Sequence, residues 1–380
     1  MNQPTSENQD ITLEKIMTFV ESQLLTEIKP REIKVYSGRN WDYLLLPSVS
    51  KYLFEDLNII DNFAPKGQYN RPGNKYKKYY ICVHDTGDPS FGAYQWSEIV
   101  RTSKIGKSNR EYKCSFQYVV GNDGYYHNIP DDEIAYHAGD GHSEESMFGL
   151  EPTGVYVNLE YKNKKEKPKI DIDKEGFYTI NGEKSKIKAP TNNNNEILKA
   201  KDINDLGIYS ELKEIDKNKY EFYLGRTWYS PVYKLIANYG GNLNSIGIEC
   251  CVNTNTDVYY SWQKLAKLVA KLMEENNFGI EAVVQHHYFS GKNCPQTTRT
   301  AKLWDYFKDL VLVEYQILYF KKQGYIFEFK SMNEKLLNEK GRILEKVENP
   351  TTVNFSITIK DKNDKSMTKS FSSLILPKLN

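Results

Sequence analysis

The chain has 380 residues, with 51 basic and 50 acidic side chains and a formal net charge of +1. A chain of this length can bury a full hydrophobic core and is expected to hold more than one domain. The near-balance of charge gives no reason to expect a nucleic acid or a strongly anionic membrane as partner, and no apolar run is long enough for a transmembrane helix.

The start of the chain lacks the basic and apolar segments of a signal peptide, so no signal peptide is visible, and a chain trimmed of its leader would look the same. The five cysteines are an odd, scattered set, which is a poor disulfide framework. Four of them stand in apolar, strand-like segments and are expected to be reduced core thiols. Only Cys294 stands in a polar loop, beside Lys292 and a proline.

Residues 1–58 are predicted to form an N-terminal helical region. Residues 11–25 are largely helix-compatible, and a second apolar patch follows at residues 43–57. No function can be inferred for this region.

Residues 59–314 alternate strand-like and helix-like patterns. Residues 79–84 are an apolar run rich in strand formers, which predicts a buried strand that ends at His84. Residues 116–120 predict a second strand, and the Gly-Asn-Asp-Gly sequence at residues 121–124 predicts a hairpin turn after it.

The same alternation continues after an interruption. Residues 245–252 predict another apolar strand, and Ser261 is the expected N-cap of the amphipathic helix that follows. Residues 282–284 predict a short strand that leads directly into His286, and a closing helix is expected after it. The pattern predicts an α/β domain with a central mixed β-sheet flanked by helices.

Two further segments differ in character from this domain. Residues 155–235 contain polar, low-complexity stretches and are predicted to be a surface insertion. Residues 315–380 are predicted to form a small C-terminal all-β module, because apolar and polar residues alternate from Val353 to Lys360. A wall-binding role is one possibility for this module.

A zinc site is the main chemical prediction. Imidazole and thiolate are ligands that zinc prefers, and His286, His287 and Cys294 lie within nine residues. Only one of the two adjacent histidines is expected to face a metal, because neighbours on a strand point to opposite faces. With His84 from the earlier strand, three protein ligands would leave a fourth position open to water, as in catalytic zinc sites. A lone histidine more often has a structural role than a metal-binding one. That is the alternative for the histidines above, and it is the role we expect for His127.

Two charged residues accompany the predicted site. Glu249 is the one charge in an apolar strand, where a carboxylate is costly unless it is paired or used. It is half of a buried salt bridge, a residue at an exposed edge position, or a general base for a water activated by zinc. Lys292 is either a solvated loop lysine or, two residues before Cys294, a group that reaches a developing oxyanion.

The string His286-His287-x₄-Lys292-x-Cys294-Pro295 resembles the C-terminal signature of the type 2, zinc-dependent N-acetylmuramoyl-L-alanine amidases. That family includes phage lysozyme-type amidases, bacterial recycling amidases and peptidoglycan recognition proteins. Other fragments of its pattern occur in order at residues 70–73, 81–87, 116–124, 129–139 and 244–249. The resemblance covers roughly residues 60–310, apart from the insertion.

The resemblance implies roles for particular residues. It implies that His84, His286 and Cys294 bind Zn²⁺, with Cys294 where many members have aspartate. It implies that Glu249 is the catalytic acid and base and Lys292 the oxyanion partner. Other members use a catalytic tyrosine on the earlier strand, at the position that aligns with Phe116 in this chain. The alignment there is fixed only to within one residue, and Tyr118 lies close to that position. His137 and Tyr136 match a histidine near the substrate cleft and a preceding tryptophan, which implies contact with the substrate.

The implied function is hydrolysis of the amide bond between N-acetylmuramic acid and L-alanine in peptidoglycan. Two alternatives remain open at this point: a non-catalytic peptidoglycan-binding recognition protein, and a multidomain surface or adhesion protein. A phage lysin, a secreted or wall-associated autolysin and a cytoplasmic recycling enzyme are all consistent with the sequence. The oligomeric state is not predicted.

Overall fold

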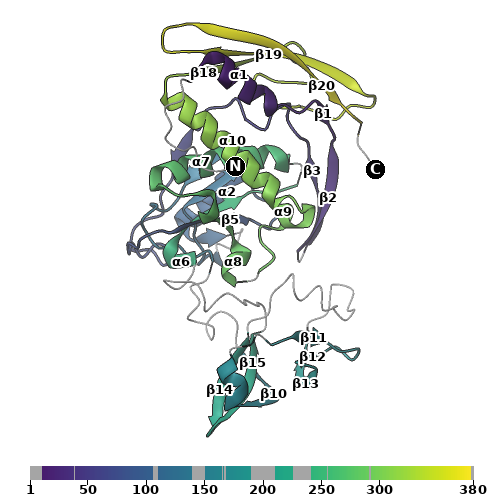
Figure 1. The fold of residues 1–380 in the computed structure, drawn as a ribbon. Coiled ribbons are helices and arrows are strands. Elements are labelled where there is room, and N and C mark those ends of the chain that lie inside the picture. The colour runs from purple at the N-terminus through teal and green to yellow at the C-terminus, as the bar shows by residue number, and fades with distance from the viewer. Residues whose placement is uncertain are drawn as a thin grey trace.

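The computed structural model describes residues 11–37, 39–105, 110–138, 150–164, 166, 168–189, 210–225, 241–254, 256–290 and 292–377. Its centre is a six-stranded sheet in the order β17-β5-β16-β8-β9-β4 (Figure 1). These strands are β4 (Ile59–Asp61), β5 (Tyr80–Asp85), β8 (Tyr118–Gly121), β9 (Gly124–His127), β16 (Ser245–Cys250) and β17 (Val283–Gln285).

The sheet is mixed, as predicted. β17, β5, β16 and β8 run parallel to one another, whereas β9 runs antiparallel to β8. β8 and β9 form the predicted hairpin, with Asn122 and Asp123 at its turn. The carboxyl ends of the parallel strands therefore meet at one edge of the sheet, where α/β folds place their sites.

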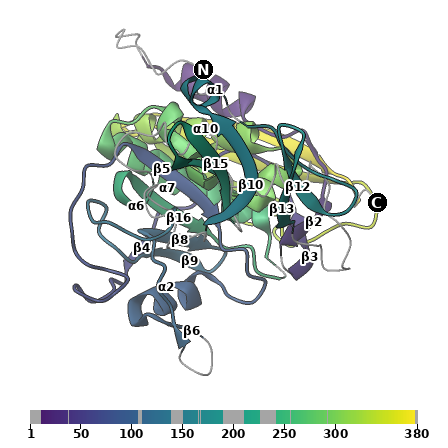
Figure 2. The ribbon, with the colours of Figure 1, turned by 90° about the horizontal axis from the view of Figure 1, so that it is seen from below.

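Helices cover both faces of this sheet. α7 (Val258–Asn276) and α10 (Trp304–Lys322) pack on one face in a core with Ile81, Val83, Ile246 and Ile248. α2 (Ala93–Thr102) packs on the other face in a second cluster with Val119. Figure 2 shows α2 beyond β8 and β9, on the side away from α7 and α10. Because strand residues alternate between faces, Cys82, His84 and Glu249 point away from α7.

Short elements complete this region. They are β6 (Lys104–Ile105), β7 (Arg110–Glu111), α6 (Gly241–Asn244), the 3-10 helix η3 (Ile280–Ala282), α8 (His286–Ser290) and α9 (Gln296–Ala301). The N-cap of α7 is Asp257, whose carboxylate accepts from the backbone N–H groups of Tyr259 and Tyr260, so the expectation of Ser261 is wrong. A carboxylate at this position suits the partial positive charge of the helix start.

The expectation of a helical region over residues 1–58 needs correction. Only α1 (Leu13–Ser22) is an α-helix there among the described residues, and β1 (Glu27–Ile28) and the hairpin β2 (Arg31–Ser37) with β3 (Arg39–Leu45) follow it. Charged and apolar residues alternate from Glu32 to Val35, which is the period of a strand, not of a helix.

The predicted C-terminal strands are present. β18 (Ile326–Ser331), β19 (Thr351–Lys360) and β20 (Ser366–Ile375) form an antiparallel sheet, and β1 adds to β20 in parallel. One face of this sheet is apolar and needs a cover. α1 and the second half of α10 supply it, as Figure 1 shows. The expected boundary at residue 315 therefore falls inside α10, and the N-terminal residues share the core of this module.

The predicted insertion forms a small β-structure of its own (Figure 1). Its strands have a local hydrophobic core that includes Val155, Tyr178 and Phe222. Parts of the range 155–235, including residues 190–209 and 226–235, lie outside the described residues. The described elements are β10 (Leu150–Asn158), α4 (Leu159–Lys164), β11 (Ile170–Ile172), β12 (Phe177–Ile180), β13 (Glu183–Lys188), β14 (Ser210–Asp216) and β15 (Lys219–Gly225).

Within the described ranges, no helix has the length and apolar character needed to cross a membrane.

Candidate metal centre and active site

The three predicted zinc ligands lie together. His84 stands near the end of β5, His286 opens α8 directly after β17, and Cys294 lies in the loop before α9. One ligand atom from each lies within 4.8 Å of the other two, and all three side chains are buried. Cys294 Sγ is 3.8 Å from His84 Nδ1, and the ring centroids of His84 and His286 are 4.6 Å apart. His287 is not a member of this group.

This spacing fits a metal. Ligands at ordinary zinc distances and a tetrahedral angle are separated by about 3.3–3.6 Å, close to the Sγ–Nδ1 separation of 3.8 Å. Nδ1 of His286 is buried and finds no hydrogen-bond partner among the described residues. A buried imidazole nitrogen without a partner is costly, and a bound cation would satisfy it.

The charge state of the ligands also suits a cation. Burial, together with the neighbouring imidazoles and Lys292, holds the pKa of His84 and of His286 well below the usual value, so both rings are neutral and keep a lone pair. Burial raises the pKa of the Cys294 thiol to about 12, with Lys292 opposing this shift. Zinc binding at Cys294 would therefore release a proton, because thiolate is the ligand form.

Glu249 faces the candidate metal position between His84, His286 and Cys294. The parallel register pairs Glu249 of β16 with His84 of β5, and Oε1 of Glu249 lies 3.8 Å from Nδ1 of His84. The Glu249 side chain is 15 % exposed, and its Oε2 has no hydrogen-bond partner in the described part of the chain. Burial raises its pKa to about 8, with Lys292 lowering it and Asp85 raising it. The buried salt bridge that the sequence left open is not the arrangement found, because the carboxylate faces a neutral imidazole.

Lys292 lies in the turn before Cys294, whose N–H donates to the Lys292 carbonyl at 2.7 Å. Its charge acts on the pKa of Glu249, Cys294 and His286. The ammonium group is therefore close enough to influence the centre. That position is consistent with a group that faces a developing negative charge.

Asp85 anchors the Cys294 loop to the end of β5. Its buried carboxylate accepts from the N–H of Thr297 at 2.6 Å. Burial raises the pKa of Asp85 to about 6, while hydrogen bonds from Thr297 and Gln296 lower it. Because Asp85 follows His84 directly, this contact fixes two of the candidate ligands relative to each other. This role of Asp85 was not predicted from the sequence, although an acidic residue directly after the strand-end His84 was an available signal.

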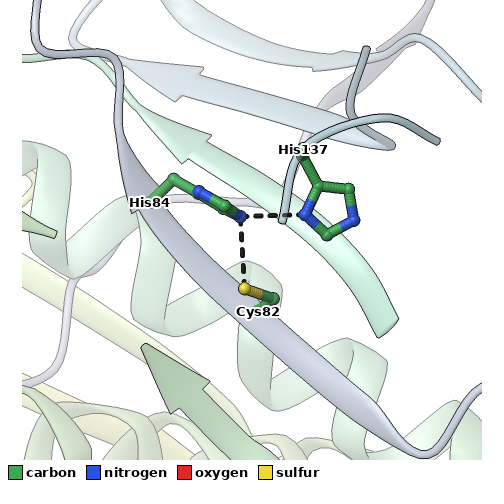
Figure 3. A group of neighbouring side chains, drawn as sticks. All are labelled: Cys82, His84 and His137. Carbon is green, nitrogen blue, oxygen red and sulfur yellow. Dashed lines mark hydrogen bonds between the residues drawn. The ribbon is translucent and has the colours of Figure 1, made fainter. Parts of the chain in front are cut away.

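His137 lies beside the His84 ring nitrogen that faces away from Cys294, and Tyr136 precedes it in the chain. Nδ1 of His137 lies 2.9 Å from Nε2 of His84, and Cys82 Sγ lies 3.2 Å from the same nitrogen (Figure 3). Burial lowers the pKa of His137 to about 3, with the charge of Lys78 a smaller cause and a backbone hydrogen bond with Ser245 opposing. The Tyr136 ring lies 6.3 Å from that of the exposed Tyr69.

Phe116 and Tyr118 are placed away from this chemistry. Phe116 is buried in the cluster beneath α2. The ring of Tyr118 is stacked on His127 with 4.2 Å between ring centroids. His127 itself lies near Asp61 and Asp131, at 3.2 Å from each carboxylate.

The contact of Cys82 with His84 was not predicted from the sequence. Cys82 was assigned to the core as a buried thiol, and it is buried and free. The signal was the spacing Cys82-x-His84, because residues two apart on a strand share a face. Together with His84 and His137 it forms a second cluster of metal-type ligands.

Comparison with known proteins gives the family. The family model described as N-acetylmuramoyl-L-alanine amidase matches residues 74–172 and 182–297, more than half of the chain. The amidase XlyA of Bacillus subtilis (strain 168) is 23 % identical over 252 residues, 66 % of this chain and 50 % of XlyA. The amidase CwlH of the same organism is 45 % identical over 56 residues, 15 % of this chain and 22 % of CwlH. The chain thus spans half or less of the length of these relatives.

Solved structures similar to this chain have low sequence identity to it. The catalytic domain of XlyA is 21 % identical with a TM-score of 0.38, covering 67 % of this chain and 99 % of that domain. The structure of PlyL is 18 % identical with a TM-score of 0.36, covering 67 % of this chain and 97 % of PlyL. On the family match, this chain belongs to the type 2 N-acetylmuramoyl-L-alanine amidase family.

Proposed function

We propose that this protein hydrolyses the amide bond between N-acetylmuramic acid and L-alanine in peptidoglycan. The observation that carries the proposal is the convergence of His84, His286 and Cys294, with Glu249 3.8 Å from His84, in a chain of this family. Zinc held by the three ligands would lower the pKa of a water molecule and polarise the scissile carbonyl.

Glu249 is the general base in this proposal. Its carboxylate faces the metal position from the neighbouring strand and takes the proton from the attacking water. The same oxygen then returns that proton to the nitrogen of L-alanine as the C–N bond breaks. Without metal, burial raises the pKa of Glu249 to about 8, and the charge of a bound cation would lower it toward neutral pH, the range that suits a group that both accepts and donates a proton.

Lys292 stabilises the negative charge that develops on the carbonyl oxygen. Its ammonium group sits on the loop that carries Cys294, so the charge and the metal ligand are placed together. An ammonium in a partly desolvated site interacts more strongly with an oxyanion than it would in water. The products are a glycan strand with a free lactyl carboxylate and a stem peptide with a free α-amino group.

The proposal is tested by determining which bond of peptidoglycan is cleaved. Purified sacculi are incubated with the zinc-loaded protein, and new amino termini and new reducing sugars are both measured. We expect free N-terminal alanine to appear without reducing ends. Reducing ends alone, or amino groups from other stem residues, would contradict the assignment. Binding to sacculi without cleavage would favour the alternative of a non-catalytic recognition protein.

The setting of the activity is also a proposal. An intact cell-wall substrate would place the protein at the wall, as an endolysin, an autolysin or a wall-associated enzyme of another kind, whereas released wall fragments would place it in the cytoplasm as a recycling enzyme. Binding of the C-terminal sheet to wall material stays a prediction. It is best tested in the full chain, because that sheet shares its core with α1 and α10.

A further inference from the structure

The ring of His84 has two nitrogens in different surroundings. Nδ1 faces Cys294 Sγ and Glu249 Oε1, each at 3.8 Å. Nε2 faces His137 Nδ1 at 2.9 Å and Cys82 Sγ at 3.2 Å, as Figure 3 shows. A neutral imidazole carries a proton on only one of its nitrogens. Which nitrogen carries it decides whether His84 can bind a metal at Nδ1.

The distances on the Nε2 side are those of hydrogen bonds. A metal bound there would separate its ligands by about 3.3–3.6 Å. Nε2 and His137 Nδ1 are closer than this, at 2.9 Å. Two ring nitrogens at that distance share a single proton, because two lone pairs or two N–H groups would repel each other. The Cys82, His84 and His137 cluster is therefore a hydrogen-bonded group rather than a second metal site.

The surroundings hold His137 in place for this contact. The Asn242 side chain accepts from the backbone N–H of His137 at 2.7 Å and from that of Ala138 at 2.8 Å. The ring lies against Gly247 so closely that a Cβ at that glycine would be 2.6 Å from three ring atoms. Glycine at position 247 is thus required for this ring position, which is an unusual restriction in the middle of a buried strand.

We infer that His137 is a positioning residue that selects the tautomer of His84. Nε2–H of His84 donates to Nδ1 of His137, which leaves the lone pair of Nδ1 on His84 facing the metal position. In the opposite arrangement, Nδ1–H of His137 would donate to Nε2 of His84. His84 would then carry its proton on Nδ1, toward Cys294, and Nδ1 could not bind a metal. Outer partners of metal-binding histidines orient the ring and raise its basicity in this way. The inference rests on the proposed zinc site and replaces substrate contact as the role of the His137 ring.

The first experiment measures zinc affinity by competition with a chromophoric chelator. We expect His137→Ala to bind zinc about 10- to 100-fold more weakly, the usual effect of losing an outer partner of a ligand. His137→Asn places an amide oxygen near the former Nδ1 and should restore most of the affinity. Gly247→Ala keeps His137 but displaces its ring and should weaken zinc binding like His137→Ala. His127→Ala, a histidine stacked on Tyr118 away from the site, should bind zinc as the unaltered protein does.

The second experiment needs no metal. Nitrogen-15 NMR of the metal-free, histidine-labelled protein reports which ring nitrogen of His84 is protonated. We expect the proton on Nε2 in the unaltered protein and in His137→Asn, and a loss of this preference in His137→Ala. Equal zinc affinity in His137→Ala and the unaltered protein, equal weakening in His137→Ala and His137→Asn, or two zinc ions per chain would overturn the inference. Failure to digest sacculi would instead count against the proposed function alone.

Discussion

The two sides of the His84 ring carry similar chemistry at different spacing. On the Nδ1 side, a thiol and a carboxylate stand 3.8 Å away and a second imidazole joins the group. On the Nε2 side, a thiol and an imidazole stand 3.2 and 2.9 Å away. The wider spacing leaves room for an ion between the atoms, whereas the closer spacing leaves room for a proton only. Ligand type alone therefore does not identify a metal site.

The two cysteines give the largest test of this comparison. Cys294→Ala removes a ligand, so we expect loss of tight zinc binding and a fall in sacculus hydrolysis of at least roughly 10³-fold. Cys82→Ala removes only a weak hydrogen-bonding partner of His84 Nε2. This variant should retain one zinc ion per chain and most of the activity. Metal analysis and hydrolysis assays on both variants check this. Equal zinc loss in the two variants would remove the distinction between the two sides.

Glu249 tests whether the carboxylate on the Nδ1 side acts on protons rather than on the metal. Glu249→Gln keeps the shape but cannot accept a proton, so we expect kcat to fall about 10²- to 10⁴-fold with zinc content unchanged. Glu98→Gln, at a carboxylate paired with Arg101 on α2, is the matched control and should leave kcat unaltered. Loss of zinc in Glu249→Gln would mean that Glu249 is a ligand instead.

Lys292 gives the smallest of the three effects. Lys292→Met removes the charge and keeps the length, so we expect a fall in kcat of about 10²- to 10³-fold, the range for loss of one oxyanion partner. KM should change much less, because the oxyanion forms only in the transition state. Lys335→Met, at an exposed lysine of the C-terminal region, is the control. A rise in KM with kcat preserved would make Lys292 a substrate-binding residue.

Much of the site was predictable because its residues end strands. The apolar runs before His84 and His286 and around Glu249 predict buried parallel strands, and their carboxyl ends meet at one edge. Alternation along a strand predicts that Cys82 and His84 share a face. It does not predict that the register of β16 on β5 places Glu249 beside His84.

The ends of the chain were less predictable, because their contacts join distant segments. α1 and the C-terminal sheet are separated by hundreds of residues but share one core, with α10 packing into both this core and the central one. A pattern within either segment shows an apolar face but not its partner. The hairpin β2–β3 was missed for a different reason: a strand period at residues 31–37 was included in a region interpreted as helical from its neighbours.

The sequence by itself determined the donor types, the strand ends that carry them and the family they resemble. Tertiary structure decided which imidazole and which thiol stand at metal spacing and which stand at hydrogen-bond spacing. The physical reason is distance: His84 meets Cys294, Glu249 and His137 only through strand pairing and loop packing between segments at least 53 residues apart. Differences below 1 Å between such contacts separate a site for an ion from a site for a proton.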